Sequence, residues 1–237
     1  MCNPRATLKL KDLFEELISK DQVHEVPSAY LEIEKRLWAS GFSFIAGVDE
    51  VGRGPLAGPV VASACILPKN VSFPSIKDSK TLTEVERKKI YDELTKSSHV
   101  FWSISCIGHQ LVDQLNILRA TLLAMKEAVE KLSRLPDFVL IDGRDTPPLH
   151  MPHQAIIKGD LQSQSIAAAS IIAKVTRDAM MDEYHEKFPQ YGFLEHKGYG
   201  TKAHLAALEK YGASPIHRQS FGPVKRLTKK EELSLFL

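Results

Sequence analysis

The sequence predicts an α/β fold: a mixed β-sheet flanked by helices, with a helical N-terminal extension and a basic C-terminal segment. Two patterns support this prediction. Short runs rich in Val, Ile, Phe and Trp are typical of strands, whereas longer segments repeat apolar residues every three or four positions, as one face of a helix does. Three strands precede the later alternation of strands and helices, which suits an antiparallel meander followed by parallel crossovers.

The helical extension is expected over residues 1–40. Apolar residues of 9–19 fall on one helical face, and the apolar spacing from Tyr30 to Trp38 predicts a second short helix. This part of the sequence carries no chemical motif, so we expect it to pack against the core. The core is expected over residues 41–195, and the basic segment over 196–237.

Five strands are expected in the core. A short segment rich in Gly and Pro separates the first two strands and fits a hairpin-like connection. The run from Asp137 to Gly143 is wholly apolar between its two acids, which predicts a central strand. The expected strands cover residues 42–48, 60–67, 100–107, 137–143 and 155–157.

Three helices are expected in the core. Thr83 is followed three residues later by Glu86, a capping-box pattern that predicts a helix from there to Lys96. A stripe of apolar residues predicts a long amphipathic helix over about residues 110–132. A third helix is expected over 166–187, where a run of small residues indicates close packing.

Composition narrows the class of protein. The 237 residues are 43% hydrophobic and 25% charged, with a net charge of +2, which is ordinary for a globular protein and says little about partners. No apolar run approaches the about 18–20 residues of a membrane helix, and the N-terminus lacks the apolar stretch of a secretory signal. Cys2, Cys65 and Cys106 lack the C-x-x-C spacing of zinc sites. We therefore expect a cytoplasmic monomer without a membrane partner.

Three acidic residues end two of the expected apolar strands. Asp49 and Glu50 close the first, and Asp142 closes the fourth. Burying a carboxylate costs several kcal/mol unless it is paired or bound to metal, so a divalent cation would explain the adjacent pair. Strand ends that share one edge of a sheet can bring Asp142 to them, although such residues also serve as turn and cap residues. Because neighbouring strand residues point to opposite faces, Glu50 can join Asp49 only if the strand is already turning, and Gly52 and Gly54 can supply that turn.

A fourth carboxylate has two candidates. Asp160 lies in a loop before the last core helix, and Asp178 lies inside that helix. Loop residues at sheet edges often build sites, which favours Asp160, although a loop aspartate is also a common turn or cap residue. Asp178 is expected to pair with a neighbouring Arg or Lys.

The glycine-rich segment that follows the acidic pair suits a ligand carrying phosphates. Gly52-Arg53-Gly54 begins a formal match to the dinucleotide-binding fingerprint, but that fingerprint requires a helix next, and a strand is expected instead. No Walker-type phosphate loop is present either. We therefore expect the loop to present backbone N–H groups and Arg53 to a nucleic-acid strand, with close approach and positive φ allowed by the glycines.

Three further segments carry groups that suit nucleic acid. Ser79 and Lys80 offer a hydroxyl and an ammonium group to a phosphate, or else form a capping loop. Tyr199, flanked by glycines, can stack on a sugar or base, or serve in packing. Residues 196–230 contain eight Lys or Arg and one acidic residue, Glu209, which makes this segment the expected polyanion contact. His217 to Phe221 is expected to be structural.

Taken together, these motifs resemble bacterial ribonuclease HII, within the type 2 ribonucleases H. The resemblance runs from about Tyr30 to Lys225, and the ordered set is much more specific than any single motif. The matching segments are Ala46–Val60, Asp78–Lys80, Ile141–Gly143, Lys158–Asp160, Ala167–Asp178, His196–Thr201 and His217–Phe221.

The resemblance implies a ribonuclease H-like fold and an endonuclease. Its substrates would be RNA in RNA–DNA hybrids and single ribonucleotides in duplex DNA, cut to leave a 3′-hydroxyl and a 5′-phosphate. It implies that Asp49, Glu50, Asp142 and Asp160 hold two Mg²⁺ or Mn²⁺ ions. It also implies that the loop of Gly52, Arg53 and Gly54 senses the ribose 2′-hydroxyl and that Tyr199 stacks on the adjoining deoxyribose.

Two alternatives remain at this stage. Another two-metal nuclease of similar fold, such as a resolvase or an integrase-like enzyme, would explain the carboxylates but not the Gly52-Arg53-Gly54 loop together with Tyr199. A non-catalytic nucleic-acid-binding module would explain the basic segment alone. The presence of all four acids speaks against that module.

Overall fold

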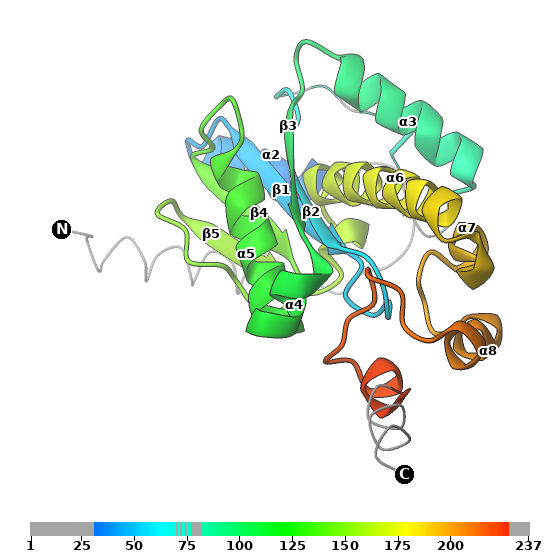
Figure 1. The fold of residues 1–237 in the computed structure, drawn as a ribbon. Coiled ribbons are helices and arrows are strands. Elements are labelled where there is room, and N and C mark those ends of the chain that lie inside the picture. Colours follow the sequence, from blue (N-terminus) through cyan, green and yellow to red (C-terminus); the bar gives the residue numbers. More distant parts are fainter. Residues whose placement is uncertain (1–30, 70, 72, 74, 77–81, 228–237) are drawn as a thin grey trace.

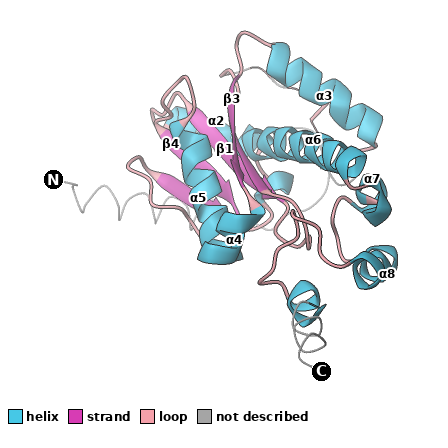
Figure 2. Ribbon diagram, in the orientation of Figure 1, coloured by secondary structure: helices cyan, strands magenta, loops and turns pink. Residues whose placement is uncertain are grey.

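The computed structural model describes residues 31–69, 71, 73, 75–76 and 82–227. A twisted sheet lies in the middle of the molecule with helices on both faces (Figures 1 and 2). Its five strands follow the order β3-β2-β1-β4-β5. The strands are β1 (Ile45–Val51), β2 (Val60–Ile66), β3 (Phe101–Ile107), β4 (Phe138–Asp142) and β5 (His153–Ile156).

The sheet is mixed, as the sequence predicts. β1, β2 and β3 form an antiparallel meander, whereas β4 runs parallel to β1, and β5 runs parallel to β4. β4 pairs on both sides, which explains why its residues Phe138, Val139, Leu140 and Ile141 are all buried. This topology places the ends of β1 and β4 at the same edge of the sheet.

The three helices expected in the core are present, but one of them is divided, and the helices at Phe193–His196 and Lys202–Tyr211 were not predicted. The stretch expected as a single long helix is two helices, because Asn116 between them adopts a φ of 70°. The Asn116 side chain supports the break, because its Oδ1 accepts a hydrogen bond from Arg119 N at 3.1 Å and caps the second helix. The helices are α2 (Glu32–Ala39), α3 (Glu84–Lys96), α4 (His109–Leu115), α5 (Ile117–Glu130), α6 (Gln164–Lys187), α7 (Phe193–His196) and α8 (Lys202–Tyr211).

Helix starts follow the chemistry of their cap residues. Thr83 caps α3, and the side chain of Glu86 accepts from Thr83 N at 2.8 Å, so the predicted capping box is confirmed. The helix α6 begins at Gln164, two residues earlier than expected, because Ser163 Oγ accepts a hydrogen bond from Ile166 N and caps it. Asp160 lies just before this cap, in the short 3-10 helix η2 (Gly159–Leu161).

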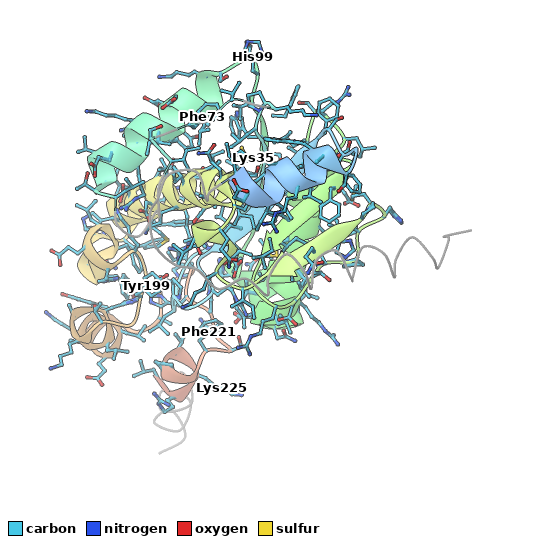
Figure 3. The ribbon with its side chains drawn as sticks, turned by 180° about the vertical axis from the view of Figure 1, so that it is seen from behind. Lys35, Phe73, His99, Tyr199, Phe221 and Lys225 are labelled. Carbon is cyan, nitrogen blue, oxygen red and sulfur yellow. The ribbon has the colours of Figure 1, made fainter. Side chains whose placement is uncertain are left out.

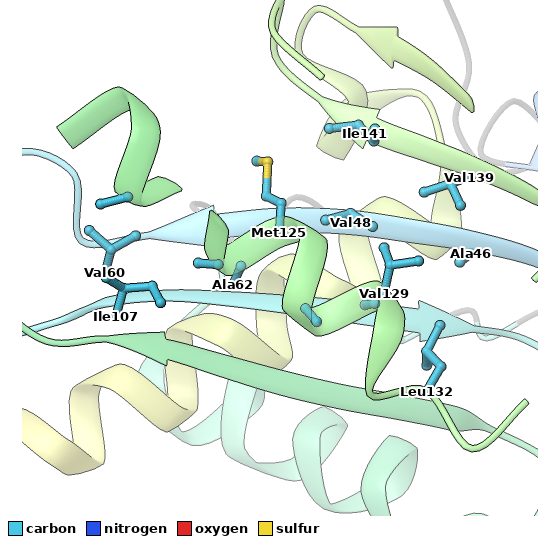
Figure 4. Packing of buried hydrophobic residues seen from close by; sticks show 14 of the residues in the cluster. Ala46, Val48, Val60, Ala62, Ile107, Met125, Val129, Leu132, Val139 and Ile141 are labelled. Carbon is cyan, nitrogen blue, oxygen red and sulfur yellow. The ribbon is translucent and has the colours of Figure 1, made fainter. Parts of the chain in front are cut away.

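The core is packed on both faces of the sheet. On one face, α5 places Met125 and Val129 over Val48 of β1 and its neighbours (Figure 4). On the other face, α6 lies so close to β1 that a Cβ atom on Gly47 would lie 2.1 Å from the backbone carbon of Ser165. Only glycine fits at this contact. The start of α6 is therefore fixed against β1 two residues before Asp49.

Two sequence predictions concern residues that the structure does not describe, and the prediction of a basic C-terminal segment needs a correction. The expected helix at 9–19 lies outside the described residues, as do Ser79 and Lys80. In the basic segment, the charge count overstates the exposed positive charge, because Arg218 is completely buried. No helix within the described part of the chain is both long and apolar enough to cross a membrane.

Candidate active site

A cleft of about 510 Å³ opens at the end of β1, beside the ends of β4 and α3. It brings together residues that lie more than 100 positions apart in the sequence. The four predicted carboxylates all line it, together with the predicted loop and Tyr199. The lining residues are Asp49, Glu50, Val51, Gly52, Arg53, Gly54, Arg87, Asp142, Asp160, Ser170, Lys174 and Tyr199.

Asp49 and Glu50 reach this cleft although the strand has not yet begun to turn at Glu50. Both lie inside β1, opposite Ser63 and Ala62 of β2, and the chain turns only afterwards, at Gly52. The expected end of the strand at residue 48 is therefore wrong. On the other side, the pairing of β1 with β4 stops at Val48. Because β4 does not pair with β1 beyond that point, both acids can line the cleft even though strand neighbours alternate in direction.

Burial and mutual repulsion act on these acids. Burial raises the pKa of Asp49 well above its usual range, and the charges of Glu50 and Asp142 raise it further. A hydrogen bond with Ser170 of α6 opposes this pKa shift. Burial also raises the pKa of Glu50, and Arg53, whose Nη1 lies 3.1 Å from Glu50 Oε1, works in the opposite direction. The carboxylates thus form a cluster in which negative charge is costly.

Asp142 and Asp160 are joined through one turn of the chain. Asp142 is the last residue of β4, and its Oδ1 accepts a hydrogen bond of 2.6 Å from Gly159 N. Asp160 follows Gly159 directly and is almost completely buried. A Cβ atom on Gly159 would lie 2.6 Å from Ile166 Cδ1, so a larger residue here would require the Ile166 side chain to move. The turn therefore sets the position of Asp160 relative to Asp142.

Of the two candidates for the fourth carboxylate, Asp160 lines the cleft. Asp178 does not line the cleft, and its Oδ1 accepts a hydrogen bond of 2.7 Å from Lys174 Nζ. This is the pairing with a neighbouring basic residue that the sequence suggests. Lys174 itself lines the cleft, so its ion pair with Asp178 holds a positively charged ammonium group in the wall of the cleft.

The donor set fits hard divalent cations. Carboxylate oxygens are the protein ligands that Mg²⁺ and Mn²⁺ prefer, and a cation would relieve the repulsion that raises the pKa of Asp49. The side chains do not form a closed cage: among the described residues, no three His, Cys, Asp or Glu groups converge closely enough to hold an ion. The four acids share one cleft, and a bound cation would have to draw them closer together.

The two glycines of the loop have different roles. Gly52 has a φ of 93°, and a Cβ atom there would lie 2.3 Å from Arg177 Nε, so both its conformation and its packing require glycine. Gly54 does not adopt a positive φ, which corrects the expectation for that residue. A Cβ atom on Gly54 would lie 3.4 Å from the ring of Tyr199. Gly54 therefore keeps the space between the loop and this ring open.

Two buried arginines hold the loop and the residues that follow it, up to Pro59, and the sequence did not identify either as a site residue. Arg218 donates to Gly52 O, Arg53 O and Gly58 O at 2.6–3.1 Å. Arg177 of α6 donates to Pro59 O, Ala57 O and Lys197 O at 3.0–3.2 Å. Burial lowers the pKa of both guanidinium groups. The expectation that the segment of Arg218 is structural therefore agrees with its contacts.

Tyr199 lies on a turn between α7 and α8 and is 44% exposed. The turn is tied to the loop because Leu56 N donates to Gly198 O at 2.8 Å. Behind it, His204 Nδ1 lies 2.9 Å from Tyr199 O and can donate to this carbonyl oxygen. Figure 3 shows Tyr199 at the same end of the molecule as Phe221 and Lys225. The backbone of Tyr199 is thus fixed, while its ring faces the cleft.

Comparison with known proteins identifies a family. The family model described as ribonuclease HII matches residues 46–224. A ribonuclease HII of Chlamydia caviae is 54% identical over 198 residues, covering 82% of this chain and 91% of that protein. A ribonuclease HII of Desulfitobacterium hafniense is 52% identical over 198 residues, covering 84% of this chain and 76% of that protein.

The fold is also found among solved structures. The crystal structure of the ribonuclease H2 from Pyrococcus horikoshii matches with a TM-score of 0.67 at 24% sequence identity. The match covers 80% of this chain and 99% of that one. At this identity the likeness concerns the fold, and it agrees with the mixed sheet and flanking helices described above.

Proposed function

The chain belongs to the ribonuclease HII family, and from this premise we propose how its cleft recognises and cuts a substrate. It is an endoribonuclease that acts on RNA in RNA–DNA hybrids and depends on divalent cations. We propose further that it cuts at single ribonucleotides embedded in duplex DNA, and that it acts as a monomer in the cytoplasm.

The observation that carries the proposed mechanism is that four acids line one cleft. Asp49, Glu50, Asp142 and Asp160 would hold two Mg²⁺ or Mn²⁺ ions, which would activate a water and neutralise the leaving 3′-oxygen. The protein would keep these acids within reach of one another through β1, β4 and the turn at Gly159. The raised pKa of Asp49 supports this proposal, because a cluster of acids is costly unless a cation compensates it.

Recognition of ribose is proposed for the backbone of the loop. In a trans peptide the N–H points away from the C=O of the same unit. Arg218 draws Gly52 O and Arg53 O toward itself, so the N–H groups of Arg53 and Gly54 point to the opposite side. Such donors can hydrogen-bond the 2′-hydroxyl, which is the group that distinguishes RNA from DNA. Tyr199, exposed across from Gly54, would stack on the neighbouring sugar.

The test is metal-dependent cleavage of a labelled RNA–DNA hybrid by the wild type and by single carboxylate variants. We expect cleavage to require Mg²⁺ or Mn²⁺, and Asp49→Asn and Asp160→Asn each to remove most of it while hybrid binding persists. Arg119→Ala, on α5 and outside the cleft, is a matched surface control. Metal-independent cleavage, or near-wild-type turnover of the carboxylate variants at saturating Mg²⁺, would overturn the proposed site.

A further inference from the structure

Glu34 is a carboxylate that the proposed mechanism does not use, yet it is completely buried. It lies on α2, which precedes the core, and burial raises its pKa. Its Oε1 accepts a hydrogen bond of 2.6 Å from Ser163 Oγ and another of 3.0 Å from Ser165 N. An apolar residue would fill the same volume without the cost of desolvating a carboxylate, so these hydrogen bonds need an explanation beyond packing.

The first of these hydrogen bonds leads to Asp160. Ser163 donates from its hydroxyl to Glu34, while the same oxygen accepts from Ile166 N and caps α6. The backbone of Ser163 then donates to Gly159 O at 2.8 Å. Gly159 N in turn donates to Asp142 Oδ1. An unbroken set of hydrogen bonds thus connects Glu34 with the turn that carries Asp160.

The second hydrogen bond leads to Asp49. Ser165 N is held by Glu34 at the place where α6 lies directly against Gly47 of β1. Later in the same helix, Ser170 forms the hydrogen bond with Asp49. A carboxylate at the first turn of a helix is also favoured by the helix dipole. Glu34 therefore holds the start of α6, and α6 is hydrogen-bonded to Asp49 and to the turn that carries Asp160.

We propose that Glu34 is a positioning residue for the metal site: it fixes the start of α6 and thereby holds Asp160 against Asp142. This inference rests on the proposed function, because it concerns the same four carboxylates. It assigns a role to the segment before the core, which carries no chemical motif of its own. Glu34 acts through Ser163 and Ser165 and does not line the cleft.

The experiment measures binding of Mn²⁺ to the full-length protein without nucleic acid, by loss of the electron paramagnetic resonance signal of free Mn²⁺. We expect Glu34→Ala to weaken Mn²⁺ binding by about tenfold, the lower end of the effect of removing a group that orients metal ligands. The Mg²⁺ concentration for half-maximal cleavage should rise similarly, with KM for the hybrid unchanged at saturating metal. Glu34→Gln keeps an oxygen that accepts from Ser163 and Ser165, and it should recover most of the binding.

Two controls separate positioning from general stability. Glu32→Ala removes an exposed carboxylate of the same helix, which pairs with Lys35. Val129→Ala weakens the core on the other face of the sheet. Both should bind Mn²⁺ as the wild type does. Equal weakening of Mn²⁺ binding in Val129→Ala and Glu34→Ala, at matched thermal stability, would overturn the positioning role.

Asp160→Asn separates failure of this inference from failure of the proposed site. Weak Mn²⁺ binding by Asp160→Asn, with wild-type binding by Glu34→Ala, would overturn the positioning role alone. Wild-type binding by Asp160→Asn would overturn the site itself. If Glu34→Ala does not fold, Glu34→Asp answers the same question, because its shorter side chain cannot reach Ser163 and Ser165 together and should also weaken Mn²⁺ binding.

Discussion

Arg218 and Gly52 are separated by 166 positions in the sequence, yet Arg218 Nη2 donates a hydrogen bond of 2.6 Å to Gly52 O. The same guanidinium group binds Arg53 O and Gly58 O. Because the C=O and N–H groups of a trans peptide unit point to opposite sides, Arg218 sets the side to which the N–H groups of Arg53 and Gly54 point. The loop and the distant C-terminal segment thus form one structural unit.

The first prediction concerns this unit. Arg218→Lys keeps a positive charge but not the planar fork that reaches three carbonyl oxygens at once, so the loop should lose its fixed orientation. We expect kcat/KM for a single ribonucleotide in duplex DNA to fall about tenfold or more, as for the loss of a charged hydrogen bond. Mn²⁺ binding should be retained. The control is Arg119→Lys at an exposed position outside the cleft; wild-type kcat/KM in Arg218→Lys would contradict the role of Arg218.

The second prediction concerns stability without metal. The raised pKa of Asp49 means that the folded protein holds a proton there more tightly than the unfolded chain does. The stabilisation that protonated Asp49 gives is therefore complete below about pH 4, the pKa of Asp49 in the unfolded chain. It is lost as the pH rises through the higher pKa of Asp49 in the folded protein. At neutral pH in EDTA, Asp49→Asn should be more stable than the wild type, and the difference in Tm should shrink as the pH approaches 4. A lower Tm for Asp49→Asn at neutral pH would contradict this account.

The third prediction concerns Tyr199. If its ring stacks on the sugar next to the ribonucleotide, it favours a deoxyribose, which has no 2′-oxygen to clash. Tyr199→Ala should therefore reduce cleavage at an isolated ribonucleotide more than cleavage within a long RNA stretch. Tyr199→Phe keeps the ring and should retain the preference. Both substrates are compared side by side for each variant, and an equal loss on both for Tyr199→Ala would make the ring a packing residue.

The fourth prediction concerns the exposed part of the basic segment. Lys225 and Arg226 are exposed at the end of the described chain, and Lys229 and Lys230 continue the same run of basic residues. Replacing all four by Ala should weaken duplex binding and flatten its salt dependence, by about one unit of slope for each phosphate that the variant no longer binds. Turnover at saturating substrate should change little. The control is Lys35→Ala, on α2 and far from Lys225 in Figure 3; an unchanged slope in the fourfold variant would show that these charges do not bind nucleic acid.

Much of the fold, and the presence of the four acids in one cleft, could be predicted because both depend on local patterns. The apolar run before Asp49, the capping box at Thr83 and the run ending at Asp142 each carry their signal within a few residues. The antiparallel and parallel parts of the sheet followed from simple rules of connection, whereas the order of the strands in the sheet was not predicted. The helix break at Asn116 was not predicted, because the apolar stripe continues across it. A single residue at positive φ does not change the spacing of the apolar residues around it.

The supporting residues could not be predicted for a different reason. Arg177 lies in α6, and the sequence of this helix does not show that its side chain donates hydrogen bonds to the carbonyl oxygens of Ala57 and Pro59. Glu34 resembles any charged residue on a short helix until α6 is seen against it. Their roles depend on hydrogen bonds across more than 100 positions, which no local period records. The acids of the cleft can be recognised from the residues next to them in the sequence. The residues that support them can be recognised only from the residues that they contact in the fold.

The most direct test of the central claim is incubation with duplex DNA that contains one ribonucleotide, with the cut mapped to the nucleotide. With Mg²⁺ or Mn²⁺ we expect one cut at the ribonucleotide, leaving a 3′-hydroxyl and a 5′-phosphate, and no cut in the matching all-DNA duplex. Asp142→Asn should lose at least about a hundredfold in rate, because a bound metal supplies several kcal/mol of charge stabilisation. Cleavage of the all-DNA duplex, or an Asp142→Asn rate close to that of the wild type, would contradict the account.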